Sequence, residues 1–464
     1  MVAIIGAGPS GIYAAEALSQ QSDVPVAVAV LDRLPVPFGL VRYGVAPDHH
    51  SIRSIRNTLE RTLEKSGVRF YGDVNIGSDV TIEELRGVVD AVIYAYGAGS
   101  DRRLGIEGED LFGSIAAPEF VAWYCGHPDV HPDIDRMAPR GAVPASKAER
   151  AARLIATTQS AVVVGVGNVA LDVARVLIKS VAELDDTDMA DDVLDSLADK
   201  MVTDVHILGR RGPAYTTFTT KELRELGQLP DVDVIVDPAD LEFDQSSRAV
   251  IEMDKVAARN VAVMADWAKA PRTNAARRIH LHFWTKPNAI LGVDQVEAVQ
   301  TERTRINADG YVEGTGETGL IPAQLVVRSV GYKGVQLPGV PFDPNTGRVP
   351  HSEGRVIRDG EFSTDEYVTG WIKRGPTGVI GTNKSDAVET VTSLLTDIHD
   401  GAIAGKHSID ELDELLADRG IHPLGMPAWH RIDAAEIELG ESHGRRRTTL
   451  AHRSELLAAA EDHT

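Results

Sequence analysis

The chain of 464 residues contains a single cysteine, Cys125. One thiol cannot form an internal disulfide, complete a cysteine-rich zinc or iron–sulfur site, or supply a Cys-x-x-Cys redox dithiol. Long hydrophobic runs are also absent, since no apolar stretch approaches the roughly 18–20 residues of a membrane-spanning helix. The first apolar segment begins at residue 2, which leaves no room for a leader peptide before it. We therefore expect a cytoplasmic protein that makes no membrane contact.

Basic residues are scarce relative to acidic ones. The chain has 47 Lys and Arg against 69 Asp and Glu, a formal net charge of −22. This balance argues against nucleic acid or an anionic membrane as the main partner. Segment 183–199 holds eight acids and no Lys or Arg, and we expect a solvated helical insertion there. With 43% hydrophobic and 25% charged residues, the composition is that of a globular protein with two or three domains.

The first 32 residues follow the order of a dinucleotide-binding βαβ unit. An apolar run at 2–5 leads into GAGPSG at 6–11, helical apolar spacing follows, and a second apolar run ends in Asp32. Gly6 permits the tight turn, Gly8 lets the backbone approach a pyrophosphate, and Gly11 lets helix and strand pack closely. Asp32 stands where an acid can accept hydrogen bonds from a ribose hydroxyl. The pattern predicts a nucleotide diphosphate at the helix N-terminus.

A second unit of the same build begins near residue 161. The apolar run 161–164 precedes GVGNVA at 165–170, and the strand expected at 205–208 ends in Gly209-Arg210-Arg211. An acid at this position would repel a 2′-phosphate, whereas paired arginines clamp it with charge-assisted hydrogen bonds. The first unit should therefore prefer an unphosphorylated ribose, and the second should prefer NADP(H) over NAD(H).

Other segments carry weaker signals. Residues 32–55 are rich in Pro and Gly, which predicts an irregular loop. Judged from its local sequence, His49 in this loop is a helix cap or a surface residue. An amphipathic helix is expected over 51–65. Segment 90–99 is typical of a buried strand whose end, including Gly97, faces the first nucleotide.

The second half of the chain divides into three regions. Residues 232–330 are mostly typical of alternating strands; His280 and His282 share one strand face there, but no third ligand lies nearby in sequence, so we predict no metal site. A Gly/Pro turn within 366–387 opens a helix. Beyond residue 400 we expect helices at 408–419 and 454–461 around a Pro-containing loop, without a catalytic constellation.

Two nucleotide units of opposite preference imply two bound dinucleotides. The simplest chemistry that they support is hydride transfer from NADPH to a bound FAD. Because the chain has no dithiol to receive the electrons, they must leave to an external acceptor.

Several longer motifs carry a specific resemblance. They are VPFGLVRYGVAPDH (36–49), GNVALDVAR (167–175), GRRGP (209–213), KELRE (221–225), LVVRSVGYKG (325–334) and GWIKRGPTGVIGTNK (370–384). They are similar to the adrenodoxin-reductase-like family of ferredoxin–NADP reductases, in order from residue 2 to about 390 and more weakly in the tail.

The resemblance implies an α/β fold with two Rossmann-like dinucleotide-binding domains. An FAD domain would comprise 1–103 and 326–464, the latter with a C-terminal helical extension, and an NADP domain of 104–325 would be inserted between them. The implied activity is FAD-dependent NADPH:ferredoxin oxidoreduction.

Motifs and resemblance together define the expected site. FAD is expected against Gly6, Gly8, Ser10, Gly11, Asp32, Leu40, Ile76, Gly97, Trp371, Gly378, Val379 and Ile380. NADP(H) is expected against Val166, Gly167, Asn168, Val169, Arg210, Arg211 and Glu222. The resemblance also places His49, Asp172 and Glu222 in a polar network near the cofactors, which reverses the interpretation of His49 drawn from its local sequence.

The implied partner is a ferredoxin or similar small iron–sulfur protein, and we expect a monomer or weak oligomer. An acidic ferredoxin would need a local basic patch on this acidic chain, for which the candidates are Arg42, Arg53, Arg272, Arg277 and Arg278. Two alternatives stay open: a flavoprotein NADPH oxidase, diaphorase or monooxygenase, and a non-catalytic electron-transfer subunit.

Overall fold

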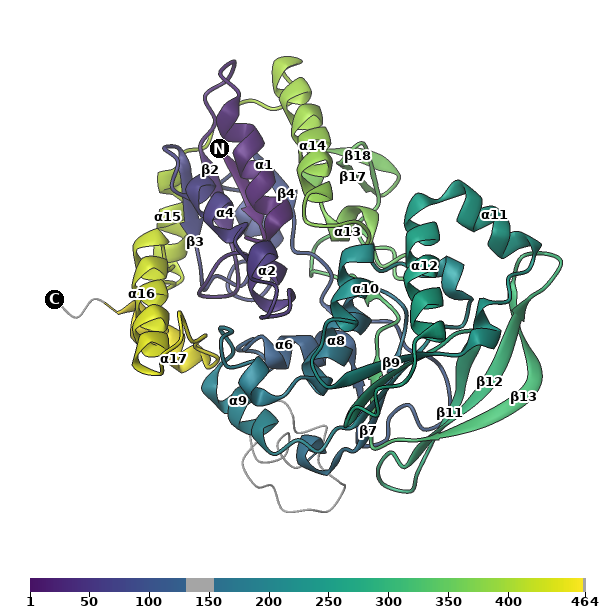
Figure 1. The fold of residues 1–464 in the computed structure, drawn as a ribbon. Helices are drawn as coiled ribbons and strands as arrows, with labels where there is room; N and C mark the ends of the chain where they lie inside the picture. Colours follow the sequence, from purple (N-terminus) through teal and green to yellow (C-terminus); the bar gives the residue numbers. More distant parts are fainter. Residues whose placement is uncertain (131–153, 462–464) are drawn as a thin grey trace. The chain divides into compact units, whose positions relative to one another are not determined.

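The computed structural model describes residues 1–130 and 154–461 (Figure 1). The chain forms two compact units, one from Met1–Ser100 with Gly331–Thr464 and one from Asp101–Val330. We call them unit 1 and unit 2. Each unit is built on a largely parallel sheet flanked by helices, which confirms the predicted fold class of two Rossmann-like domains, one inserted into the other.

Unit 1 is organised around a seven-stranded sheet. Its centre is β1 (Val2–Ile5), which pairs in parallel with β2 (Val28–Leu31) and β4 (Ala91–Tyr94). All three strands are buried throughout, because helices cover both faces of a parallel sheet. The full order is β16-β17-β18-β4-β1-β2-β3, with β3 (Val68–Tyr71), β18 (Glu361–Val368) and the antiparallel β17 (Arg355–Arg358) and β16 (His351–Ser352).

The helices of unit 1 come from both ends of the chain. The first helix, α1, packs against α4 and against the long helix α14, and Figure 1 shows α1 and α14 side by side. The helices are α1 (Pro9–Gln20), α2 (Leu40–Tyr43), α3 (His50–Arg53), α4 (Arg56–Leu63), α5 (Ile82–Arg86), α13 (Trp371–Arg374), α14 (Thr382–His399), α15 (Ile409–Asp418), α16 (Met426–Ser442) and α17 (Arg453–Ala460).

Two helix predictions in unit 1 were wrong. The helix expected over 51–65 is divided into α3 and α4, because Ile55 N–H bonds to the carbonyl of Ile52 in a tighter turn. The Pro-containing loop expected in the tail is present at 420–425, which includes Pro423, but 426–442 form the helix α16. Its proline, Pro427, lies in the first turn, where a missing N–H costs nothing.

Unit 2 is built on a six-stranded parallel sheet of order β6-β14-β7-β8-β10-β9. Its strands are β6 (Ser114–Ala116), β7 (Ser160–Val164), β8 (Asp204–Leu208), β9 (Val232–Val236), β10 (Arg277–His282) and β14 (Leu325–Arg328). A separate antiparallel sheet consists of β11 (Thr285–Leu291), β12 (Ala298–Ile306) and β13 (Val312–Pro322). Where the chain passes from one unit to the other, the short strands β5 (Ser100–Asp101) and β15 (Tyr332–Lys333) form a two-stranded ribbon.

The helices of unit 2 correct two expectations. The region 232–330 is not mostly strand, since Asp244 and Asp254 cap two helices within it, α11 (Gln245–Met253) and α12 (Lys255–Lys269). The acidic segment 183–199 contains a helix as expected, α9 (Asp191–Ala198), but this helix is not solvated all round, because it buries Val193 and Leu197. The others are α6 (Ala117–Tyr124), α8 (Asn168–Ile178) and α10 (Thr220–Leu226). Among the described residues, no helix combines the length and apolarity that crossing a membrane requires.

Candidate functional site

The first glycine turn joins β1 to α1. Gly6 has a φ of +110°, and a Cβ there would lie 2.6 Å from the carbonyl oxygen of Ala95. A Cβ on Gly11 would lie 2.0 Å from the carbonyl oxygen of Gly6. The protein itself thus requires glycine at both positions. A Cβ on Gly8, in contrast, would meet nothing within 4 Å, so the bare backbone there leaves room for a ligand.

The N-terminus of α1 and Asp32 complete this turn. Gly8 is the N-cap of the 12-residue helix, and no side chain caps its first turn. Free N–H groups at a helix N-terminus suit a diphosphate. The Asp32 carboxylate accepts hydrogen bonds from the N–H of Ala7 (2.7 Å) and of Leu34 (3.0 Å), which fixes it beside the glycines. This cradle fits the diphosphate and ribose of a dinucleotide.

The segment after β18 joins the same turn. Gly370 has a φ of +78°, and a Cβ on it would lie 2.3 Å from Ser10 Oγ. Ser10 Oγ donates to Asn383 Oδ1 at 2.9 Å, and Arg374 Nη2 donates to the same oxygen at 2.6 Å. Residues near the start of the chain and beyond position 370 therefore form one site.

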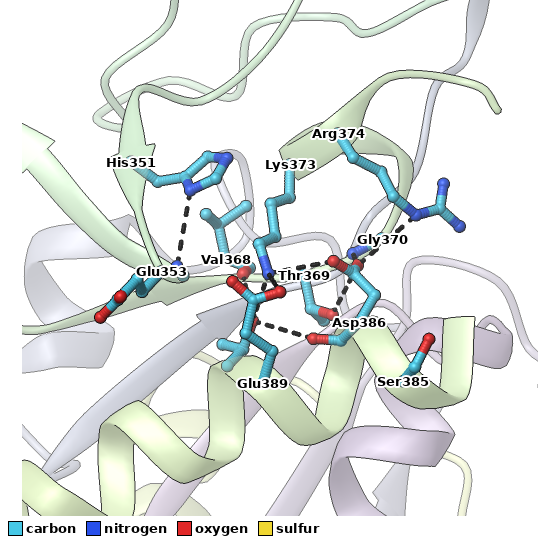
Figure 2. Close-up of polar contacts among 12 residues, drawn as sticks. His351, Glu353, Val368, Thr369, Gly370, Lys373, Arg374, Ser385, Asp386 and Glu389 are labelled. Carbon is cyan, nitrogen blue, oxygen red and sulfur yellow. Dashed lines mark hydrogen bonds and ion pairs between the residues drawn. The ribbon is translucent and has the colours of Figure 1, made fainter. Parts of the chain in front are cut away.

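A buried ionic cluster lies beneath this segment (Figure 2). One carboxylate oxygen of Asp386 accepts from the N–H of Gly370 at 2.5 Å and from Thr369 Oγ1 at 3.1 Å. Its other oxygen lies 3.0 Å from Lys373 Nζ, which is also 3.3 Å from Glu389. Asp386 thus holds the Gly370–Trp371 backbone in place. No local pattern in the sequence links Asp386 to Gly370, so this role could not be predicted.

A second buried cluster ties the C-terminal extension to the short helix α2, which begins at Leu40. Arg42 makes two hydrogen bonds to Glu436 of α16, whose carboxylate also accepts from Arg447 at 2.8 Å. Burial opposes ionisation of Glu436, but the charges of both arginines outweigh it and hold the pKa of the carboxyl below its usual value. The Phe38 ring packs edge-on against Trp429 at 5.3 Å.

The remaining positions expected at FAD are spread over unit 1. Gly97 follows β4 with a φ of +78° and open space where a Cβ would stand, and Ile76 is buried. Trp371 begins α13, and its ring lies 5.2 Å from that of Tyr332. Gly378 has a φ of +82°, and Val379 is 62% exposed, unusual for an apolar side chain.

The second glycine turn joins β7 to α8 in unit 2. Gly165 has a φ of +135°, and a Cβ there would lie 2.1 Å from the carbonyl oxygen of Ser329. Gly167 is the N-cap of α8 and, like Gly8, has no side chain capping the helix. Asn168 Oδ1 accepts from the N–H of Thr219 at 2.8 Å, and Val166 O accepts from that of Thr217 at 2.9 Å. The turn is therefore braced by the 217–219 segment.

The arginine pair follows β8, where a 2′-phosphate binder is expected. Arg210 and Arg211 are exposed, and among the described residues neither guanidinium has an acidic partner. Arg211 lies over the Tyr215 ring, 5.6 Å from its centre. The backbone of the pair is fixed, because Arg210 O accepts from Thr304 Oγ1 at 2.9 Å. Two uncompensated guanidinium groups on a fixed turn suit a phosphate monoester.

The three expected members of the polar network belong to different units. In unit 2, Asp172 accepts from Arg175 Nη2 at 2.8 Å, and Glu222 lies 3.7 Å from Arg175 Nη1. Arg175 is 2% exposed, so it is the buried cation that joins the two acids, a role that the sequence analysis missed. His49 lies in unit 1, where it is the N-cap of α3.

The expected basic docking patch is wrong in part. Arg42 is only 3% exposed and belongs to the Glu436 cluster. Arg53 donates to Val45 O at 2.8 Å, while Arg277 and Arg278 pair with Glu183 and Asp204. Buried or paired arginines contribute little to the surface potential that a partner meets.

The two turns, one facing an acid and one facing two arginines, define a flavoprotein class with two dinucleotide-binding domains. A family model described as pyridine nucleotide-disulphide oxidoreductase matches residues 1–227. The Mycobacterium tuberculosis protein named NADPH-ferredoxin reductase FprA is 44% identical over 98% of both chains. A protein of Arabidopsis thaliana named mitochondrial NADPH:adrenodoxin oxidoreductase is 36% identical over 99% of this chain and 95% of its own.

Solved structures agree with these similarities. The structure of M. tuberculosis FprA in complex with NADPH superposes with a TM-score of 0.89 at 44% identity, covering 99% of each chain. This chain belongs to the adrenodoxin-reductase-like family of NADPH–ferredoxin reductases, oxidoreductases that use FAD and NADP(H).

Proposed function

We propose that this chain oxidises NADPH and passes the electrons through FAD to a small iron–sulfur protein of the ferredoxin type. The observation that carries the proposal is the pair of glycine turns, one beside Asp32 and the other beside Arg210 and Arg211. The names of the relatives, NADPH-ferredoxin reductase and NADPH:adrenodoxin oxidoreductase, support the choice of acceptor.

FAD, when bound, supplies a hydride acceptor that can release electrons one at a time. In unit 1 we assign its diphosphate to Gly6, Gly8, Ser10 and Gly11, and its ribose to Asp32. Leu40, Ile76, Gly97, Trp371 and 378–380 would line the rest of the molecule.

In unit 2 we assign the NADP(H) diphosphate to Val166, Gly167, Asn168 and Val169, and its 2′-phosphate to Arg210 and Arg211. Asp172 and Glu222, joined by Arg175, would orient the nicotinamide end together with His49. Hydride transfer depends on alignment of donor and acceptor, so these residues act by positioning rather than by proton transfer.

The acceptor lies outside the chain. The single cysteine, Cys125, is buried, and one thiol cannot cycle between dithiol and disulfide. An internal relay of the disulfide-reductase type is therefore excluded, and this favours an external one-electron acceptor.

The test measures NADPH oxidation by the FAD-loaded protein with a ferredoxin, with a quinone and with oxygen alone. We expect fast reduction of the ferredoxin and slow reduction of oxygen. Oxygen or quinone reduction as fast as ferredoxin reduction would identify an oxidase or diaphorase. Negligible turnover with every acceptor would favour an electron-transfer subunit instead.

A further inference from the structure

Three histidines meet on the sheet of unit 2. The parallel strands β8 and β10 are neighbours, and their register pairs His206 with His280. Side chains two positions apart on a strand share a face, so His282 lies on the same side. The third ligand that the sequence did not offer near His280 and His282 is thus supplied by a neighbouring strand.

The three rings are close enough to share one ion. One nitrogen from each histidine can be chosen so that all three lie within 4.8 Å of one another. His206 Nδ1 and His282 Nε2 are 3.0 Å apart. Two nitrogens on a tetrahedral zinc ion, each about 2.0–2.1 Å from the metal, are separated by roughly 3.3 Å. The separation of this pair is therefore close to that of two ligands on one zinc ion.

The outer contacts are those of a metal-binding histidine. His280 Nε2 lies 2.9 Å from Asp204 Oδ1, which leaves its Nδ1 as the ligand atom. Arg278 makes two hydrogen bonds of 2.7 Å to the same carboxylate and holds it in place. A carboxylate behind a ligating imidazole fixes the ring and increases its basicity.

The surroundings of the three rings are charged but open. The charged groups around them are Asp204, Arg278, Asp237 and Arg303. All three histidines are only half-buried, so an ion can reach them from solvent.

We propose that His206, His280 and His282 form a binding site for Zn²⁺ or another imidazole-preferring divalent cation, with Asp204 as the supporting carboxylate. The rings of His206 and His280 are stacked 4.3 Å apart at 14°. Lone pairs of parallel rings do not converge, so binding must turn the rings out of the stack. This is a side-chain rotation on strands whose register is already fixed, and water would supply the fourth ligand.

A backbone hydrogen bond connects the histidine site to the turn that carries Arg210 and Arg211. The carbonyl of His282 accepts from the N–H of Gly209 at 2.8 Å, directly before Arg210 and Arg211. The proposal does not depend on the proposed function, because it concerns metal affinity alone.

The experiment titrates the FAD-loaded, chelator-treated protein with Zn²⁺ against a chromophoric chelator. The matched control is His430→Gln, which removes the rival cluster of unit 1, where His430 Nε2 lies 3.1 Å from Glu64 and 3.4 Å from Glu60. We expect one tight ion in the wild type and in His430→Gln. Affinity should fall at least a hundredfold in His206→Gln and about 10–100-fold in Asp204→Asn.

A second measurement keeps the test independent of how the variants fold. X-ray absorption of the wild-type zinc adduct should show three imidazole nitrogens at about 2.0–2.1 Å. An oxygen-dominated shell, wild-type affinity in a folded His206→Gln protein, loss of the ion in His430→Gln, or no tight ion in the wild type would each overturn the proposal.

Discussion

Gly8 and Gly11 occupy one turn, but neighbouring protein atoms restrict only Gly11. Gly11→Ala places its methyl group 2.0 Å from the carbonyl oxygen of Gly6, so unit 1 should lose at least about 1–3 kcal/mol of stability. Gly8→Ala meets no protein atom and should change stability by less than about 1 kcal/mol. Its FAD affinity should nevertheless fall about tenfold or more, since the methyl group takes the space of the diphosphate.

Urea unfolding of the apoprotein and fluorescence titration with FAD separate the two effects. A Gly8→Ala protein with wild-type FAD affinity would show that the diphosphate does not lie over this turn.

The arginine pair should set the choice between NADPH and NADH. Each charge-assisted hydrogen bond is worth about 1.5–3 kcal/mol, so Arg210→Ala with Arg211→Ala should raise KM for NADPH by at least tenfold and leave that for NADH almost unchanged. Arg305→Ala is the matched control, because Arg305 is an exposed arginine of the same unit paired with Glu313. Steady-state kinetics with both coenzymes provide the measurement. An unchanged ratio of the two KM values would refute the 2′-phosphate assignment.

At the scale of elements, α16 stabilises the short helix α2 through the bonds between Glu436 and Arg42. Glu436→Gln leaves Arg42 buried without its counter-charge and Arg447 with Asp433 alone, and losing one partner of a buried ion pair costs about 3–5 kcal/mol. Asp433→Asn is the control, because Asp433 also pairs with Arg447 but its side chain is 25% exposed; we expect a loss of about 1 kcal/mol or less. Chemical denaturation, monitored by flavin absorbance, measures the loss of stability in both variants. Equal losses in the two variants would mean that α16 does not depend on the buried charge.

The turn between β18 and α13 depends on a different acid. Asp386→Asn keeps the size of the side chain but removes the charge that faces Lys373 and weakens the bond to the Gly370 N–H. We expect FAD to dissociate about tenfold faster. Glu389→Gln, which changes an exposed acid on the same lysine, should stay within about twofold of wild type. Stopped-flow release of flavin measures both rates, and similar rates in the two variants would remove Asp386 from the FAD site.

At the scale of the whole molecule, the features found from sequence are those that neighbouring residues determine. The strand 2–5 was predicted with its observed bounds, and the roles of Gly6 and Gly11 follow from a turn that closes within six residues. Both sheets follow from the repeated strand–glycine–helix order.

What the sequence did not predict depends on contacts between distant segments. Glu436 is 394 positions from Arg42, and the buried pairing of these residues moved Arg42 from the expected docking surface to the interior. His206 reaches His280 only through the pairing of β8 with β10. The helix α16 was missed because a Pro-containing loop was expected in this region, although a first-turn proline such as Pro427 is compatible with a helix.

The stability of unit 1 should fall in acid, because a buried carboxylate on a strand of its sheet becomes protonated. Glu366 of β18 is fully buried, and it accepts hydrogen bonds from Arg358 (2.6 and 2.9 Å) and Tyr94 (2.6 Å). Burial opposes its ionisation, but these bonds and the charge of Arg86 outweigh that effect and lower the pKa of the carboxyl. As the pH falls, the Glu366 carboxyl of the unfolded chain, with a pKa of about 4.3, therefore binds its proton before that of the folded chain does.

The stabilisation is thus complete above about pH 4.3 and is lost as the pH falls through the lower folded pKa, at up to about 1.4 kcal/mol per pH unit. Glu366→Gln should lower stability at neutral pH and flatten this dependence. Glu361→Gln, at the exposed start of the same strand, should keep the wild-type slope. Urea midpoints of unit 1, followed by flavin release between about pH 3 and 6, give the slopes. If Glu366→Gln and wild type lose stability in parallel, other carboxylates, with Glu436 the first to examine, govern the acid response of this unit.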